Sequence, residues 1–344
     1  MMQVTTLAPS ALVGAQAGPA DPARLRTLLA ARGRWHPAEI LFFAVLPACF
    51  WLFPNHTLLL TQIAIAGLFA MSLDLMQGYG GMPSLGHAAY FGLGSYGAGL
   101  LAVNGIDDPL VTLALAAMIG ALAGALSGAL LSRMHGIALL MLTLSMGLIL
   151  RELGLRWSGL TGGEDGLYGA FFGPLFGRIE FDLYGVAAFW YVLAVTVVLV
   201  LFTRRVLASP FGVRLEAVRE SPRRAQALGI SPERTRFTAI VMSATMAAMA
   251  GALLAQTTNF VALETLSLER SVSALVMVAL GGMRSIYGAF LGAALYLVAR
   301  DQLSALDPTY WYFWLGLVII AVATFLGDGI VGLGRRLLAR GARA

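Results

Sequence analysis

Long apolar runs separated by short connections restrict the fold of this chain more than any other feature. A helix needs about 20 apolar residues to cross the hydrocarbon core of a bilayer. We place such runs, two of them shorter parts of a broken pair, at 39–54, 57–77, 84–103, 110–132, 136–157, 183–203, 237–258, 271–283, 286–300 and 310–333. The pattern predicts an all-α polytopic membrane protein with about eight to ten transmembrane helices.

Composition leads to the same class of protein. Hydrophobic residues make up 58% of the 344 residues, charged residues only 12%, and the mean hydropathy is +0.79. A soluble domain has about 25% charged residues because its surface faces water. The charge here is too sparse to cover a soluble globule, so lipid must cover most of the surface.

The arginines predict the orientation of the chain. Eight lie within 204–236 and four within the C-terminal tail 335–344. Because basic loops stay on the cytoplasmic side, we expect cytoplasmic N- and C-termini and a cytoplasmic loop at 204–236. Residues 1–38 are predicted to be a disordered tail, and 39–334 the membrane region. The basic residues lie in loops between apolar runs, so they indicate contact with membrane lipid and no nucleic-acid partner.

The basic residues also exclude one kind of chemistry. All 23 are arginines, and a Walker A site needs a lysine to hold the nucleotide phosphates. Any ATP-driven work must therefore be done by separate subunits. Cys49 is the single cysteine and the four histidines are scattered, so we expect no metal site and no cofactor. No paired catalytic constellation is apparent, and we do not expect an enzyme.

The count of crossings has one irregular element. With both termini on one side, the number of full spans must be even. The pair 271–283 and 286–300 must then enter and leave by the same face, and its first arm has only about 13 residues. This length favours a broken or re-entrant helix.

The segment Gly78–Leu101 is the first candidate for function. Its glycines break the backbone before Ser84, which is a plausible N-cap of a new helix. A helix N-terminus inside a membrane suits a substrate carboxylate. Asp74 either contacts a substrate amine or forms a structural pair, and His87 is either a packing residue or a ligand. The candidate residues of a substrate path are Asp74, Tyr79, Gly80, Gly81, Ser84 and His87.

A weak internal similarity connects this segment with the broken pair. Gly80–Leu85 (Gly-Gly-Met-Pro-Ser-Leu) resembles Gly281–Ile286 (Gly-Gly-Met-Arg-Ser-Ile). Transporters often contain two structural repeats whose broken helices meet. Glycine pairs are common in membrane helices, so chance explains the similarity equally well.

The loop 204–236 is the second candidate. It contains three Ser-Pro pairs, at Ser209, Ser221 and Ser231, and each suits a helix start with serine as N-cap. We expect short helices at about 210–220 and 222–228, with Gly229 ending the second. These helices present charged side chains that suit docking of a soluble partner.

Together these features resemble the permease subunits of bacterial ABC importers for branched-chain amino acids, a family that also includes urea and amide importers. The likeness extends over about residues 57–330. It is carried by Gly78–Leu101, by Leu142–Leu167 with its Leu-Thr-Gly-Gly-Glu-Asp-Gly-Leu end, by Ser209–Ala255 and by Val278–Leu297. Where relatives often have asparagine before the Gly-Tyr-Gly-Gly segment, this chain has Asp74.

The resemblance implies a division of labour in a bacterial inner membrane. The expected partners are a second permease in a heterodimer, two ATP-binding subunits and a periplasmic substrate-binding protein. The residues that would couple to the ATP-binding subunits are Glu216, Arg219, Glu220, Arg223, Ala227 and Gly229. The substrate stays open between branched-chain amino acids and urea or short amides. A stand-alone secondary transporter is a further alternative.

Overall fold

The computed structural model describes residues 37–174, 185–325 and 329–332. Within them the chain is almost entirely helical, and the β pairing is limited to an isolated bridge between Leu167 and Val261. The all-α prediction is confirmed. Pro37 and Ala38 begin the first helix, whereas the rest of the predicted tail 1–38 and the basic tail 335–344 lie outside the described residues.

The long helices follow the apolar runs. They are α2 (Pro37–Leu52), α3 (Thr57–Asp74), α4 (Ala88–Val103), α5 (Pro109–Leu131), α6 (Gly136–Arg156), α8 (Val186–Ala208), α11 (Pro232–Thr258), α12 (Leu268–Gly281), α13 (Ile286–Leu306) and α14 (Trp311–Phe325). The short helices are α7 (Ser158–Thr161), α9 (Pro210–Glu220) and α10 (Pro222–Ala227), and 3₁₀ turns lie at Pro54–His56, Gly163–Asp165 and Leu263–Leu266.

In the described part of the chain, five helical segments are long and apolar enough to cross a membrane. They are the segment Pro54–Tyr79, which includes α3, together with α5, α6, α8 and α11. The bent pair of α12 and α13 would be a sixth, and α4 is apolar but shorter. The protein is thus a multi-pass membrane protein. The sequence predicted eight to ten crossings, more than these five or six. That number stays a prediction, as does the side of the membrane on which the termini lie.

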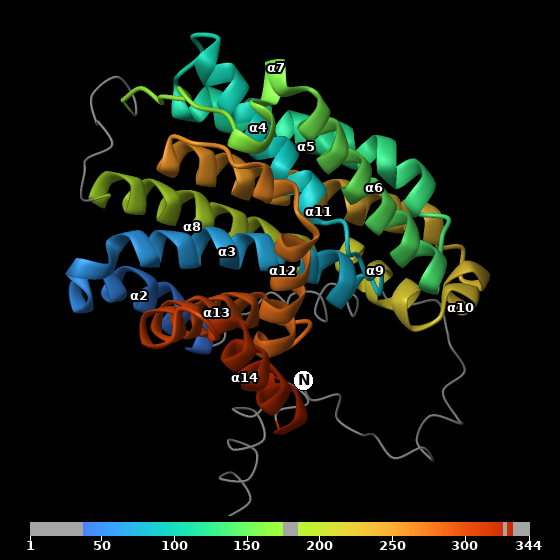
Figure 1. Cartoon of the computed structure of the whole chain (residues 1–344). Coiled ribbons are helices and arrows are strands. Elements are labelled where there is room, and N and C mark those ends of the chain that lie inside the picture. The colour runs from blue at the N-terminus through green and yellow to red at the C-terminus, as the bar shows by residue number, and fades with distance from the viewer. Residues whose placement is uncertain (1–36, 175–184, 326–328, 333–344) are drawn as a thin grey trace, which may run out of the picture.

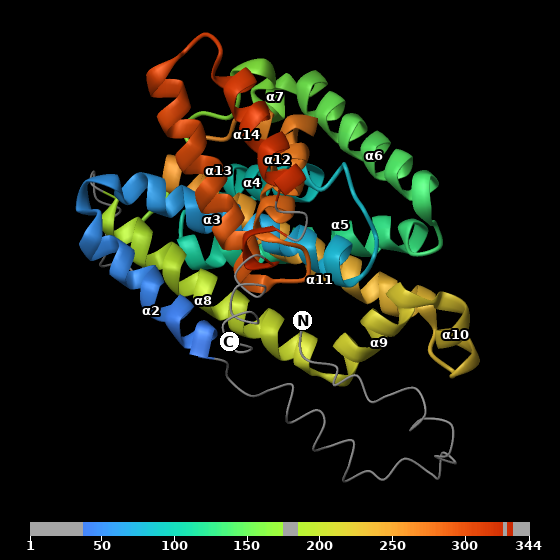
Figure 2. The ribbon, with the colours of Figure 1, turned by 90° about the horizontal axis from the view of Figure 1, so that it is seen from below.

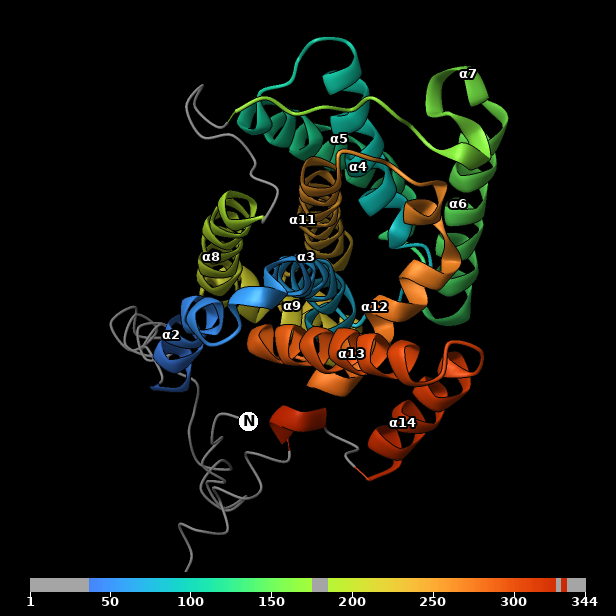
Figure 3. The same ribbon diagram turned by 60° about the vertical axis from the view of Figure 1, so that its left-hand side comes forward.

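The helices form a bundle around α11. Helices α3, α8 and α11 run side by side, with α9 and α10 at one end of the bundle (Figure 1). Figure 3 looks nearly along these helices and shows α13 crossing beneath α3. Helix α6 lies on one flank and α2 on the other (Figure 2).

Small residues bring the backbones of α4 and α11 into contact. A Cβ added at Gly251 would lie 1.9 Å from the carbonyl oxygen of Phe91, and one at Gly94 would lie 2.0 Å from that of Ala248. Neither distance is possible for a real side chain. Close approach through small residues is the usual way in which membrane helices pack, since lipid tails are as apolar as leucine.

The chain breaks after α3, but the next helix begins later than expected. The end of α3 continues as a wider π-helical segment, Leu75–Tyr79, and α4 begins only at Ala88. The prediction of a helix start at Ser84 is therefore wrong. The amide of Leu85 donates to Thr143 Oγ1 of α6 at 3.2 Å, and a Cβ at Gly86 would lie 1.8 Å from the Thr143 carbonyl oxygen. Contact with α6 thus holds this segment out of a helix.

The second predicted break is confirmed. Helices α12 and α13 meet at an angle of 114° across Gly282–Ser285. Gly282 and Arg284 both adopt positive φ angles, of 104° and 63°. Glycine takes such angles without strain, whereas arginine does so rarely. The backbone of Arg284 must therefore be held by its neighbours.

The loop at 204–236 forms the two predicted short helices. The hydroxyl of Ser209 accepts a hydrogen bond from the amide of Phe211, and that of Ser221 accepts one from Arg224. Gly229, at φ 80°, follows the end of α10. The third serine also precedes a helix start as predicted, with Ser231 at the N-cap position of α11 and Pro232 as its first residue, but its side chain makes no cap hydrogen bond.

Candidate functional site

The carboxylate of Asp74 joins the end of α3 to the break between α12 and α13. It is 1% exposed, and it accepts hydrogen bonds from the backbone amides of Arg284 at 3.0 Å and Ser285 at 3.2 Å. Because two amide groups hold this carboxylate, its contact in the described structure is with protein backbone. Its place in a substrate path remains a prediction.

Two neighbours of Asp74 complete this contact. The hydroxyl of Tyr79 donates to the carbonyl oxygen of Arg284 at 2.9 Å, so Arg284 is held through both its amide and its carbonyl. A Cβ at Gly78 would lie 1.9 Å from Asp74 Oδ1, which leaves room only for glycine. The two similar Gly-Gly-Met segments of the sequence therefore lie next to each other at their breaks.

Helix α9 packs against this contact between Asp74, Tyr79 and Arg284. The side chain of Arg284 lies 3.6 Å from Glu216 of α9, and a Cβ at Gly81 would lie 2.7 Å from Cγ of Arg219. Burial lowers the pKa of Arg219, the nearby charge of Arg284 lowers it further, and Asp74 and Glu216 act in the opposite direction. We call the contact among Asp74, Tyr79, Glu216, Arg219 and Arg284 the α9 junction.

The other predicted path residues are packed inside the bundle. His87 is fully buried, its Nε2 is hydrogen bonded to Ser72 Oγ at 2.9 Å, and its ring stacks on Phe69 at 5.5 Å. Ser84 is 1% exposed, and Gly80 contacts the carbonyl of Met76. The place of these residues in a substrate path stays a prediction.

The remaining coupling candidates lie on the outer surface of α9 and α10. Glu220, Arg223, Ala227 and Gly229 are exposed, whereas the opposite faces of these helices are buried through residues such as Leu215 and Ala225. Leu228 is 79% exposed at the end of α10.

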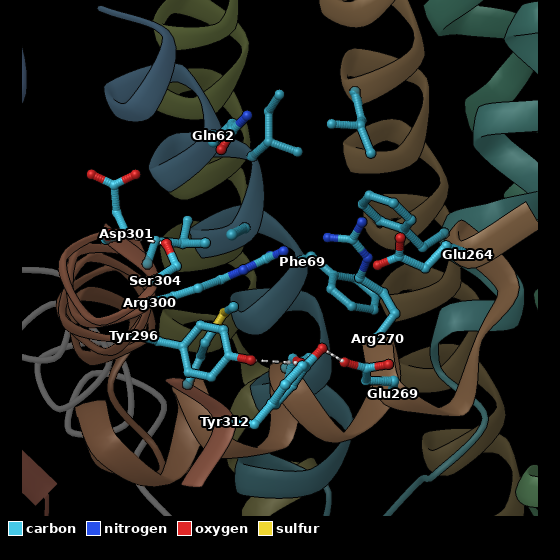
Figure 4. Close-up of a pocket in the computed structure, with 18 of the residues that line it drawn as sticks. Gln62, Phe69, Glu264, Glu269, Arg270, Tyr296, Arg300, Asp301, Ser304 and Tyr312 are labelled. Atoms are coloured by element: carbon cyan, nitrogen blue, oxygen red, sulfur yellow. Dashed lines mark hydrogen bonds between the residues drawn. The ribbon is translucent and has the colours of Figure 1, made fainter. Parts of the chain in front are cut away.

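A cavity of about 380 Å³ opens between the middle of α3, the start of α4 and helices α11 to α14 (Figure 4). This volume falls within the roughly 300–1,000 Å³ of small-molecule sites. Its buried lining is apolar and includes Ile65, Phe69, Phe91, Ala274 and Met277. Its mouth is charged.

Five charged side chains line the cavity: Glu264, Glu269, Arg270, Arg300 and Asp301. Glu269 accepts a hydrogen bond from the hydroxyl of Tyr312, and Arg300 lies 5.5 Å from the ring centroid of Trp311. Arg270 lies 5.6 Å from the ring centroid of Phe91, and its buried Nε has no hydrogen-bond partner among the described residues.

Sequence reasoning did not single out these five residues. They lie in the short segment before α12, at the start of α12 and near the end of α13, and they come together only because the pair folds back on itself. Charges at both outer ends of a broken apolar pair were the signal in the sequence that could have found them.

Comparison with known proteins identifies the family. Residues 55–323 match the family model described as branched-chain amino acid transport system / permease component. The chain therefore belongs to this family of membrane permeases. The family assigned from the sequence is confirmed.

Individual relatives agree with this assignment. The chain is 30% identical over 296 residues to the high-affinity branched-chain amino acid transport system permease protein LivM of Salmonella typhimurium, covering 80% of this chain and 69% of that protein. It is 30% identical over 242 residues to the probable branched-chain amino acid transport permease protein LivH of Methanocaldococcus jannaschii, covering 68% and 75%. The autoinducer 2 import system permease protein LsrC of Escherichia coli O9:H4 is 34% identical, but over only 45% of this chain and 47% of its own length. No solved structure matches the chain.

Proposed function

We propose that this chain is the permease subunit of an ABC importer and forms half of the translocation path for branched-chain amino acids. The observation that carries the proposal is the pair of short helices α9 and α10, of which α9 packs through the α9 junction onto both backbone breaks of a chain in the permease family. A pair of helices in this position can pass a push from a soluble subunit to the membrane helices.

The source of energy follows from composition. A chain without lysine has no Walker A lysine, so two separate ATP-binding subunits would dock on α9 and α10. This role makes the chain a transport subunit and not an enzyme. The arginines of 204–236 favour a cytoplasmic position for that face in a bacterial inner membrane, and both termini would lie on the same side.

The remaining partners follow from the proposed importer. A second permease would supply the other half of the path in a heterodimer, and a periplasmic binding protein would deliver the substrate to the opposite face. Relatives named as branched-chain amino acid permeases match two thirds or more of the chain, which favours these substrates over urea or short amides.

Reconstitution of the complex tests this function. The chain is assembled in liposomes with the second permease and the ATP-binding subunits, and uptake of labelled leucine is measured with the binding protein outside. We expect uptake that requires both ATP and the binding protein. Uptake by the chain alone under an ion gradient would instead identify a secondary transporter, and uptake of urea but not leucine would identify the alternative importer.

A further inference from the structure

The cavity between α3 and helices α11 to α14 has the chemistry of a site for a free amino acid. We propose that it binds a zwitterionic amino acid with an apolar side chain, and that Arg270 holds the α-carboxylate. This inference rests on the proposed function, because it places the substrate of the importer within this chain.

Arg270 is the centre of the site. Its guanidinium contacts the face of Phe91, and its buried Nε is without a hydrogen-bond partner among the described residues. A buried donor left unpaired is unfavourable, and more so when the group is charged. A carboxylate would satisfy this donor, and arginine binds carboxylates through two parallel hydrogen bonds. Arg270 also lies in the first turn of α12, where the helix dipole favours an anion.

The acidic side chains suit the ammonium group. Glu264 lines the cavity with an exposed side chain that is in no ion pair within the described part of the chain, and Asp301 is exposed on the opposite wall (Figure 4). Together with Glu269 these acids balance Arg270 and Arg300 to within one charge. A site of this kind suits a zwitterion better than a ligand with a net negative charge.

The apolar floor suits the side chain of such a substrate. Phe69, Phe91 and Met277 are all nearly fully buried and line the cavity beneath its charged mouth. A ligand whose carboxylate reaches Arg270 and whose ammonium group faces the acids would direct its side chain toward this floor. Burying an aliphatic side chain there removes its apolar surface from water and so favours binding.

A cysteine in the cavity wall provides a direct test. Ser273, which lines the cavity and is half-buried, is replaced by cysteine in a chain whose single natural cysteine has been removed by Cys49→Ala. The complete importer in liposomes is treated with a small maleimide, and the rate of labelling is measured with and without leucine. The matched control is Ser158→Cys, which is exposed in α7 beyond the end of the α6 span.

We expect leucine to slow labelling at position 273 and to leave labelling at position 158 unaffected. Leucinamide lacks the carboxylate and 4-methyl-2-oxopentanoate lacks the ammonium group, so neither should protect. Adding Arg270→Gln should raise the leucine concentration for half-protection by about ten- to a hundredfold, the usual effect of losing a charged hydrogen bond. Arg270→Lys should retain part of the protection.

Two results would overturn the proposal. One is equal protection by leucine and leucinamide. The other is an Arg270→Gln importer that elutes as an assembled complex and imports leucine with an unchanged KM. Arg156→Gln, in the exposed pair with Glu152, is the arginine control. If the unaltered importer takes up leucine with ATP while these results are obtained, the cavity assignment fails and the proposed function stands. A complex without leucine uptake would refute the function itself.

Discussion

Replacing Asp74 should destabilise the protein strongly, because its carboxylate satisfies two buried amides of another helix pair. Each hydrogen bond to a charged group contributes about 1.5–3 kcal/mol, so Asp74→Ala should lower the free energy of unfolding by about 3–6 kcal/mol. Asp74→Asn keeps one acceptor oxygen and should lose about half of that. Since a whole domain is stabilised by only about 5–15 kcal/mol, either loss is readily measured.

The chain contains a matched control for this prediction. Asp108 also accepts two backbone amides, from Leu110 and Val111, but at the solvent-accessible start of α5. Because asparagine caps a helix about as well as aspartate, Asp108→Asn should change stability by no more than a few tenths of a kcal/mol, and Asp108→Ala by about 1 kcal/mol. The difference in stability loss between the Asp74 and Asp108 variants therefore separates the effect of the buried α9 junction from that of an ordinary helix cap.

Unfolding in detergent, followed by tryptophan fluorescence during denaturant titration, measures these differences. The substrate competition profile of Asp74→Asn in the reconstituted importer should match that of the unaltered protein. The reason is that the Asp74 carboxylate is bound by the backbone amides of Arg284 and Ser285. Equal stability losses for Asp74→Asn and Asp108→Asn would refute the junction reasoning. A changed substrate profile with unchanged stability would instead assign Asp74 to the path.

Three further outcomes are expected. Gly229→Val should reduce the leucine uptake per ATP hydrolysed and leave membrane insertion intact. Gly229→Asn should have a milder effect, since residue 229 has a φ of 80° with open space around it and asparagine tolerates that backbone angle. The same uptake per ATP in Gly229→Val and the unaltered importer would contradict a coupling role for Gly229. Gly251→Ala should lower the thermal unfolding midpoint in detergent by several degrees because its Cβ meets the backbone of α4, and Gly316→Ala, with no atom within 4 Å, should not. Ser209→Ala should cost about 1 kcal/mol of unfolding free energy, measured by the same titration, and Ser231→Ala close to none.

The sequence by itself determined the class of protein and most of its helices. Apolar runs of about 20 residues have no stable alternative to helices in lipid, because every backbone polar group must be paired within the segment. The Ser-Pro pairs and Gly229 similarly predicted α9 and α10, since caps and left-handed glycines act through local geometry. Both features depend on neighbours in the chain and are therefore readable from it.

The tertiary structure decided the start of α4, the role of Asp74 and the charged cavity. Ser84 has the local signature of an N-cap, yet contact with α6 keeps that segment out of a helix until Ala88. Asp74 meets the amides of Arg284 and Ser285, 210 and 211 residues further along the chain. Arg270 and Arg300 line one cavity only because the chain turns by 114° between α12 and α13. These contacts depend on which distant segments pack together, and no local pattern in the sequence specifies that.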